Sequence, residues 1–285
     1  LRSGPFSLSA APRDSEDGRR FARSAPNIPS RAAAVPAMPD RHHSTLFFGP
    51  KNVDEFLGHL RNMLLGLKTL IGSFTGDNLI TFDKNLSFLH DARFMAAFEA
   101  HAQTKIEKGI IWRTAVLAWA AKNALRLEGD LVECACYKGV SARIVCDYLD
   151  FAAQDRRYYL YDLFEHDPSM PHHAMTEHGD GLYEQVKARF ADFPNVVVTR
   201  GRVPDTFAQA APDRIAFLHI DMNNAEAEIA VLDHLFDRLV PGAVIILDDY
   251  GWLFYRRQKY AHDQWFGARG YSVLELPTGQ GMVIK

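Results

Sequence analysis

Three carboxylates follow two apolar segments in the second half of the chain. Asp221 comes directly after residues 217–220, and Asp248 and Asp249 come directly after residues 243–247. If both segments are parallel strands of one sheet, their carboxyl ends meet at the edge where open α/β sheets bind ligands. Carboxylate oxygens are the ligands that Mg²⁺ prefers. The pattern therefore predicts a metal or catalytic site at Asp221, Asp248 and Asp249. Capping and turn formation are the structural alternative, which explains one acid better than three.

A second group of residues could hold a nucleotide-like cofactor. The segment from Glu133 to Ser141 leaves a predicted strand, turns at Gly139 and enters a helix, and the glycine lets the backbone approach a ligand. Asp162 ends the next predicted strand, where a carboxylate can bind ribose hydroxyls or, alternatively, cap a helix. Arg202 follows the third strand, either near an adenine edge or in a simple helix start. No Gly-x-Gly-x-x-Gly motif occurs, which disfavours a dinucleotide.

These residues depend on an alternation of strands and helices beyond Gly129. Strands are expected at 131–136, 158–163, 196–199, 217–220 and 243–247, with helices at 141–152, 181–190 and 225–239. This alternation is typical of a doubly wound parallel sheet. Two short strands at 271–276 and 281–284, joined by four residues, predict a C-terminal antiparallel hairpin.

The part of the chain before this alternation has a different composition. Residues 1–45 are rich in Ala, Ser, Pro and Arg, which predicts a disordered tail, and the start at Leu1 suggests that the natural N-terminus is absent. Residues 46–128 are expected to be a helical region with helices at 53–71, 87–103 and 106–127. That region would cover the site or pair subunits, so we expect a homo-oligomer. Residues 129–285 would form the α/β domain.

Composition excludes several other classes of protein. The net charge is -3, which gives no field to attract nucleic acid. No apolar run is long enough to cross a bilayer, so no membrane partner is expected. The three cysteines, Cys134, Cys136 and Cys146, suit buried thiols in a reducing compartment. We therefore expect a soluble, cytoplasmic protein.

The ordered pattern of these segments resembles the macrocin O-methyltransferase family. The resemblance covers about residues 111–285 and rests on Trp112–Arg113, 129–133, 161–165, 219–222 and 241–250. It implies a class I methyltransferase fold, which is a Rossmann-like doubly wound α/β sheet with a C-terminal antiparallel hairpin. It also implies S-adenosylmethionine as methyl donor, Mg²⁺, and a hydroxylated small-molecule acceptor, such as a sugar or a glycosylated natural product.

The resemblance also implies which residues form the site. Asp221, Asp248 and Asp249 would hold the metal, and the cofactor would contact Glu133, Ala135, Tyr137, Gly139, Ser141, Asp162, Arg202 and Asp221. Two positions depart from the family pattern. Ala135 stands where the first glycine of the cofactor loop is usual, and Asn223 stands where a second acid commonly follows Asp221. An asparagine can offer a carbonyl oxygen but no charge.

The expected reaction is in-line transfer of a methyl group from a sulfonium to a hydroxyl oxygen. Asp221 and Asp249 are the acidic residues that we expect to take part in catalysis. Residues 166–178 form a long connection that could be a lid, and His172 in it could be the base; a solvated polar loop is the alternative. Two other functions stay open. One is a methyltransferase that acts without a metal, and the other is a non-catalytic protein that keeps the fold.

Overall fold

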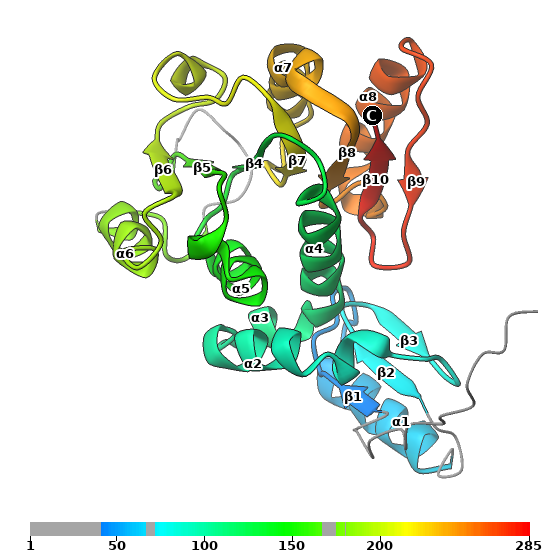
Figure 1. The fold of residues 1–285 in the computed structure, drawn as a ribbon. Coiled ribbons are helices and arrows are strands. Elements are labelled where there is room, and N and C mark those ends of the chain that lie inside the picture. Colours follow the sequence, from blue (N-terminus) through cyan, green and yellow to red (C-terminus); the bar gives the residue numbers. More distant parts are fainter. Residues whose placement is uncertain (1–40, 67–71, 167–174, 180) are drawn as a thin grey trace, which may run out of the picture. The chain divides into compact units, whose positions relative to one another are not determined.

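The largest element of the structure is a seven-stranded sheet (Figure 1). The structure is a computed structural model that describes residues 41–66, 72–166, 175–179 and 181–285. The strand order is β6-β5-β4-β7-β8-β10-β9. The strands are β4 (Asp130–Cys134), β5 (Tyr158–Asp162), β6 (Val196–Arg200), β7 (Ile215–Ile220), β8 (Leu239–Leu247), β9 (Leu274–Glu275) and β10 (Gly281–Ile284). Neighbours from β6 to β8 pair in parallel, whereas β10 pairs antiparallel with both β8 and β9. The predicted doubly wound sheet and C-terminal hairpin are therefore confirmed.

The order of the strands reverses between β4 and β7. From β4 the chain moves outward to β5 and β6, and it then returns to add β7 and β8 on the other side. The carboxyl ends of β4 and β7 thus diverge into loops that leave a crevice between them, which is where open α/β sheets bind ligands. The loop of residues 135–139, which is expected to hold the cofactor and is called the cofactor loop below, follows β4, and Asp221 follows β7.

Helices cover both faces of the sheet, as Figure 1 shows. On one face lie α4 (Ile111–Ala124) and α5 (Val140–Leu149), and on the other lie α7 (Ala225–Leu235) and α8 (Arg256–Gly267). The remaining helix of the α/β alternation is α6 (Leu182–Arg189). Strands β5, β6, β7 and β8 consist mainly of Val, Ile, Leu and aromatic residues, as is typical of parallel strands with helices on both faces.

The predicted helical region also contains strands that the sequence analysis missed. A three-stranded sheet joins β1 (Arg41–His43), β2 (Ser73–Gly76) and β3 (Leu79–Thr81) beside α1 (Val53–Gly66). The whole of β1 therefore lies within the predicted tail of residues 1–45, and residues 1–40 lie outside the described part. Helix α4, which we placed in this region, packs against β7 and β8. The described residues belong to one compact unit.

Two of the predicted long helices are interrupted. The second is a short 3₁₀ helix (Ser87–His90) followed by α2 (Ala92–His101), because the side chain of Asp91 accepts hydrogen bonds from the backbone N–H groups of Arg93 and Phe94 and starts a new helix. The third consists of α3 (Lys105–Gly109) and α4, and Thr104 caps α3. The sequence pattern did not reveal these breaks, because the helical spacing of apolar residues continues across the capping residues Asp91 and Thr104.

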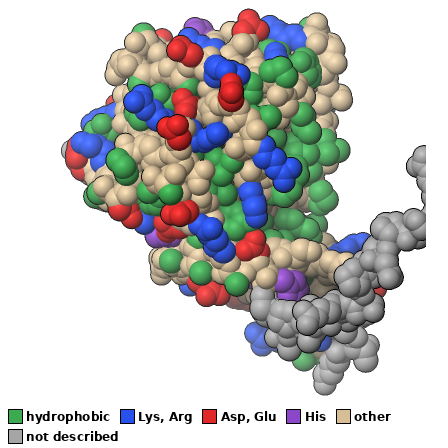
Figure 2. All heavy atoms as spheres, in the orientation of Figure 1, with side chains coloured by type: hydrophobic (Ala, Val, Ile, Leu, Met, Phe, Trp, Pro, Cys, Tyr) green, Lys and Arg blue, Asp and Glu red, His purple; other side chains and the backbone are tan. Residues whose placement is uncertain are grey.

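The surface carries charges of both signs. Figure 2 shows acidic and basic side chains interspersed over the face in view, with apolar side chains gathered beside α4 and the β9–β10 hairpin. Trp119, Leu274 and Ile284 are the large exposed apolar residues of these elements. No helix of the described ranges is both long enough and apolar enough to span a bilayer. The homo-oligomer stays a prediction.

Gly139 starts α5 and provides a direct test of this fold. Its φ of 66° is left-handed, and a Cβ there would lie 2.8 Å from the Phe190 ring. We expect Gly139→Ala to lower the free energy of unfolding by about 1–2 kcal/mol, since left-handed backbone is strained for any residue with a Cβ. Urea denaturation measures this. The matched variant Gly267→Ala, at the end of α8 where a Cβ meets nothing within 4 Å, should not destabilise the protein; equal losses in both variants would contradict the explanation.

Candidate functional site

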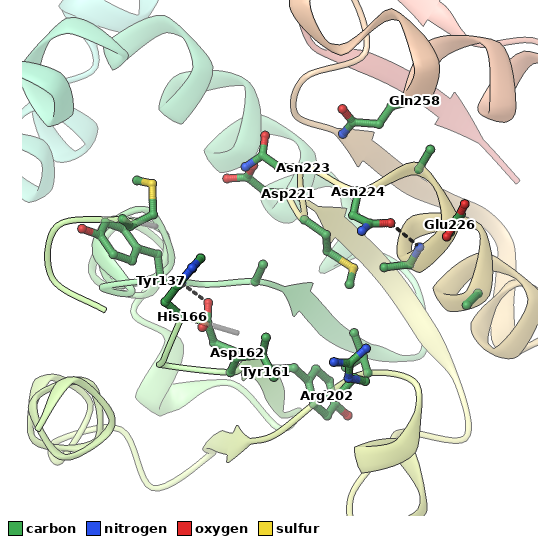
Figure 3. Close-up of a pocket in the computed structure, with 18 of the residues that line it drawn as sticks. Tyr137, Tyr161, Asp162, His166, Arg202, Asp221, Asn223, Asn224, Glu226 and Gln258 are labelled. Carbon is green, nitrogen blue, oxygen red and sulfur yellow. Dashed lines mark hydrogen bonds between the residues drawn. The ribbon is translucent and has the colours of Figure 1, made fainter. Parts of the chain in front are cut away.

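A cavity of about 920 Å³ lies outside the carboxyl ends of the parallel strands (Figure 3). Each of the five strands from β6 to β8 is followed by a segment that contributes to its wall. The lining residues are Ala135 and Tyr137 after β4, Tyr161–Leu163, Glu165 and His166 at and after β5, Gly201–Pro204 after β6, Asp221–Ala227 and Ala230 after β7, and Phe254, Tyr255, Arg257 and Gln258 after β8, together with Met175 and His178. The cavity is therefore at the predicted position.

The loops around this cavity contain several residues in left-handed backbone conformation. Ala135, Tyr137, Phe164 and Asn223 have φ values of 70°, 48°, 58° and 55°. Such conformations are uncommon for residues other than glycine and cluster at ligand-binding sites. Ala135 adopts the left-handed conformation that glycine would provide without strain. The first departure from the family pattern is therefore accommodated by the backbone.

Asp162 holds two of these loops in place. Its Oδ2 accepts a hydrogen bond from the backbone N–H of Tyr137 at 2.7 Å, and its Oδ1 accepts one from the backbone N–H of Phe164 at 2.6 Å. Burial raises the pKa of the Asp162 carboxyl, and these two N–H groups oppose that shift. Asp162 also lines the cavity. Its first role is thus to fix the cofactor loop, and the predicted contact to a ribose would use the remaining acceptor capacity of the same oxygens.

Three of the residues predicted to contact a cofactor do not line the cavity: Glu133, Gly139 and Ser141. Glu133 is buried in the sheet, where its Oε2 accepts a hydrogen bond from the Tyr158 hydroxyl at 2.7 Å. Gly139 packs against Phe190 instead. Five other predicted residues do line it: Ala135, Tyr137, Asp162, Arg202 and Asp221. The sequence could not separate the two groups, because Glu133, Gly139 and Ser141 lie within a few residues of the lining residues Ala135 and Tyr137.

The three predicted metal-binding carboxylates have different surroundings. Asp221 lines the cavity, whereas Asp248 and Asp249 do not. Both oxygens of Asp248 are engaged, since Oδ2 accepts from Arg113 Nη1 and Oδ1 accepts from Gln280 Nε2, each at 2.8 Å. Within the described ranges, no group of three or more Asp, Glu, His or Cys side chains is arranged to hold a metal ion. The predicted three-carboxylate ligand set is therefore not formed in this structure.

Arg113 explains why Asp248 stays ionised. The guanidinium bonds Asp77 through Nε and Nη2 at 2.6 and 2.7 Å, and its Nη1 lies 3.5 Å from Asp249. Burial favours the neutral acid, but Arg113 and His219 outweigh it and hold the pKa of Asp248 well below its usual range. The sequence pattern alone predicts no role for Arg113 in the site. A lone arginine among the apolar residues of α4 was the available signal.

Asp221 and Asp249 are compensated less well, because the nearby charge of Arg113 does not outweigh burial and the neighbouring carboxylates. Burial, followed by the charges of Asp248 and Asp249, raises the pKa of Asp221 well above its usual range. Burial and Asp248 raise the pKa of Asp249 to about 8. Asp249 can therefore take up a proton near neutral pH, and both carboxylates hold a proton more readily than an ordinary Asp does, which favours a role in proton transfer.

The segment that precedes α6 also approaches the cofactor loop. The Tyr137 hydroxyl donates to Glu177, and Lys138 Nζ lies 3.4 Å from Glu177 and 2.6 Å from Glu107. His178 lines the cavity. His172, the predicted base, lies outside the described residues, so both it and the lid stay predictions.

Comparisons with known proteins agree with this geometry. Residues 115–265, just over half of the chain, match the profile of the macrocin O-methyltransferase family (TylF). The chain belongs to the macrocin O-methyltransferase family. A curated relative from Streptomyces olivaceus, 8-demethyl-8-(2,3-dimethoxy-alpha-L-rhamnosyl)-tetracenomycin-C 4'-O-methyltransferase, is 31% identical over 138 residues. That match covers 43% of this chain and 53% of the relative, so the chain spans about half the length of the relative.

Solved structures share the fold at low sequence identity. The O-methyltransferase NovP is 19% identical with a TM-score of 0.53, over 66% of this chain and 88% of NovP. The calicheamicin methyltransferase CalS11 is 16% identical with a TM-score of 0.51, over 95% of this chain and 99% of CalS11. These similarities confirm the class I methyltransferase fold that the macrocin O-methyltransferase family implies.

The opposite surroundings of Asp248 and Asp249 predict opposite effects on stability. Asp248→Asn should lower the free energy of unfolding by about 3–5 kcal/mol, since it leaves Arg113 and His219 without their shared partner. Asp249→Asn should raise it by about 1–3 kcal/mol at about pH 8 in metal-free buffer, since the contact with Arg113 at 3.5 Å does not offset the cost of burying this charge beside Asp248. Thermal unfolding in EDTA measures both.

The pH dependence of the two effects has a definite sign. The depressed pKa of Asp248 means that its contribution is present above about pH 4, the ordinary value for Asp, and is lost as the pH falls below it. The cost of Asp249 is absent below about pH 4 and grows as the pH rises to about 8. Asp249→Asn should therefore have little effect near pH 4. Destabilisation by Asp249→Asn at both pH values would refute the assignment.

Proposed function

We propose that this chain is an S-adenosylmethionine-dependent O-methyltransferase that acts on a hydroxyl of a sugar or another small-molecule natural product. The observation that carries the proposal is the cavity at the carboxyl ends of β4 and β7, where the Asp162-anchored loop and Asp221 both contribute to the wall. The names of relatives support it. The Streptomyces olivaceus relative is a 4'-O-methyltransferase of a rhamnosyl-tetracenomycin, and CalS11 is described as a TDP-rhamnose 3'-O-methyltransferase.

The methyl donor would occupy the side of the cavity formed by β4, β5 and β6. The loop held by Asp162 offers polar groups for the amino-acid part and the ribose, and Arg202, Val203 and Pro204 offer a mixed wall for the adenine. Met222 adds apolar surface from the loop after β7. This arrangement leaves Asp221 and the start of α8 for the acceptor.

In the proposed reaction the acceptor oxygen forms a bond to the methyl carbon while the bond from carbon to sulfur breaks. The sulfur keeps the electron pair, and the hydroxyl proton passes to the Asp221 carboxylate. Burial and the neighbouring carboxylates raise the pKa of Asp221, so it is a stronger base than an ordinary Asp carboxylate. The walls of the cavity hold the two reactants in line, which can lower the barrier by several kcal/mol.

We further propose that Mg²⁺ supports this reaction. The donor set fits a cation at Asp221 and Asp249, whose carboxylates are buried without a positive partner that matches their charge. It does not fit at Asp248, which Arg113 and Gln280 already engage. Bound there, the ion would polarise a hydroxyl of the acceptor. Because Arg113 and Gln280 bind both oxygens of Asp248, one of the three predicted metal ligands is already occupied. This favours a second candidate function, a methyltransferase that acts without a metal.

The remaining proposals concern the surroundings of the protein. Cys134, Cys136 and Cys146 are free and buried, which suits a reducing compartment, and we infer a cytoplasmic location. We also infer a homo-oligomer, with the exposed apolar residues beside α4 as the contact surface. Analytical ultracentrifugation tests the second inference.

Methyl transfer from trideuteromethyl S-adenosylmethionine to a panel of glycosides tests the function, with mass spectrometry of the products. We expect a methylated product, and we expect Asp221→Asn to lower kcat by about 10²–10⁴-fold, the usual contribution of a general base, while S-adenosylhomocysteine still binds. Asp237→Asn changes an exposed acid remote from the cavity and serves as the control. Full activity of Asp221→Asn would contradict the proposed base.

The same assay separates the two candidates for the metal. Loss of activity in EDTA that Mg²⁺ restores is the expected result. Two results together would support the metal-independent candidate instead. The activity would persist in EDTA, and Asp249→Asn would bind Mn²⁺ no more weakly than the wild type does.

A further inference from the structure

The wall of the cavity formed by α8 contains a side-chain amide whose orientation is fixed by the fold. Gln258 is only 4% exposed and lines the cavity. Its Nε2 donates to Glu228 Oε1 at 2.7 Å. Because a carboxylate accepts hydrogen bonds and has none to donate, the NH₂ group must face Glu228. The carbonyl oxygen of Gln258 is therefore left for the cavity.

Glu228 is itself held firmly. It lies on α7 with an exposure of 2%, and its Oε1 also accepts from the backbone N–H of Met222 at 3.2 Å. His262 Nε2 of α8 lies 3.1 Å from its Oε2. One buried carboxylate thus connects α7, α8 and the loop after β7, and it fixes Gln258 relative to Asp221. Glu228 does not line the cavity, so it acts through Gln258.

A second acceptor oxygen lies in the loop after β7. Asn223 Oδ1 is buried and has no hydrogen-bond partner in the described part of the chain. Buried polar atoms are nearly always paired, so an unpaired one at a cavity wall indicates a missing donor. Figure 3 shows Asp221 and Asn223 side by side, with the Gln258 side chain extending from α8 toward them. Three oxygen acceptors therefore belong to one part of the cavity.

We propose that Gln258 and Asn223 bind two hydroxyl groups that neighbour the reacting hydroxyl, with Glu228 as the positioning residue, so that the acceptor is a polyol such as a sugar ring with free adjacent hydroxyls. The inference rests on the proposed function, in which Asp221 takes the proton of the reacting hydroxyl. A site built to bind a hydroxyl rejects an analogue that lacks it, because its buried polar group is then left unpaired. Simple phenols, with one donor, leave both amide oxygens unpaired.

The test measures kcat/KM for methyl transfer to methyl α-L-rhamnopyranoside and to its three monodeoxy analogues, alongside methyl glucoside, methyl galactoside and 4-methylumbelliferone. We expect transfer to at least one sugar, and a loss of at least about 100-fold when a hydroxyl beside the methylated position is removed. Gln258→Leu should show a similar loss on the parent sugar and should no longer discriminate against one deoxy analogue.

Further variants separate recognition from folding. Gln258→Met fills the same volume and should behave like Gln258→Leu. Glu228→Gln should weaken the discrimination, because its own amide can donate and no longer fixes the direction of Gln258. Gln209→Leu, an exposed glutamine that does not line this cavity, should change nothing. S-adenosylhomocysteine affinity should stay within about twofold in all of them, which a general loss of structure would not allow.

The outcomes distinguish this inference from the proposed function. Equal rates for parent and deoxy sugars, preference for 4-methylumbelliferone, or discrimination that persists in both Gln258 variants would overturn the inference. Binding of S-adenosylhomocysteine without transfer to any sugar would also overturn it. Failure of the wild type to bind S-adenosylhomocysteine would instead contradict the proposed function.

Discussion

The burial of acids at the carboxyl ends of β7 and β8 is the constraint on which the site depends. Isolated ionised carboxylates are costly to bury, so each must be paired, protonated or bound to a cation. Arg113 pairs Asp248 and is anchored in turn by Asp77 from the β2–β3 turn. Asp249 lies 3.5 Å from Arg113 Nη1, but for both Asp221 and Asp249 burial and the neighbouring carboxylates outweigh the guanidinium. The same cluster therefore contains one acid with a lowered pKa and a structural role and two acids with raised pKa values, whose charge depends on pH or on a ligand.

This division of roles links the small N-terminal sheet to the site. Asp77 lies in the turn between β2 and β3, far from Asp248 in sequence, and Arg113 joins the two through a bidentate pair and a further hydrogen bond. The cofactor side uses a different device, in which Asp162 binds backbone N–H groups and holds left-handed loops. Both devices fix the backbone before any ligand is present, which is how preorganised sites avoid the cost of ordering on binding.

The sequence predicted the parts of this structure that follow from periodicity and strand ends. These parts are the parallel strands, the hairpin and the position of Asp221. Buried strands consist of apolar residues, so the first polar residue after such a segment marks the start of a loop. It did not predict β1–β3, which are too short to show a period. It also could not show that Asp248 faces Arg113 or that Glu133 faces Tyr158, since the direction of a side chain at a strand end depends on long-range partners.

The central claim is that the cavity outside the carboxyl ends of the parallel strands binds the methyl donor, and calorimetric titration of S-adenosylhomocysteine tests it most directly. The wild type should bind with one site per chain. Ala230→Trp, which fills the cavity from α7, should abolish binding, whereas Ala152→Trp, at an exposed position away from the cavity, should not change it. Undiminished binding by a folded Ala230→Trp variant would place the cofactor elsewhere and contradict the account.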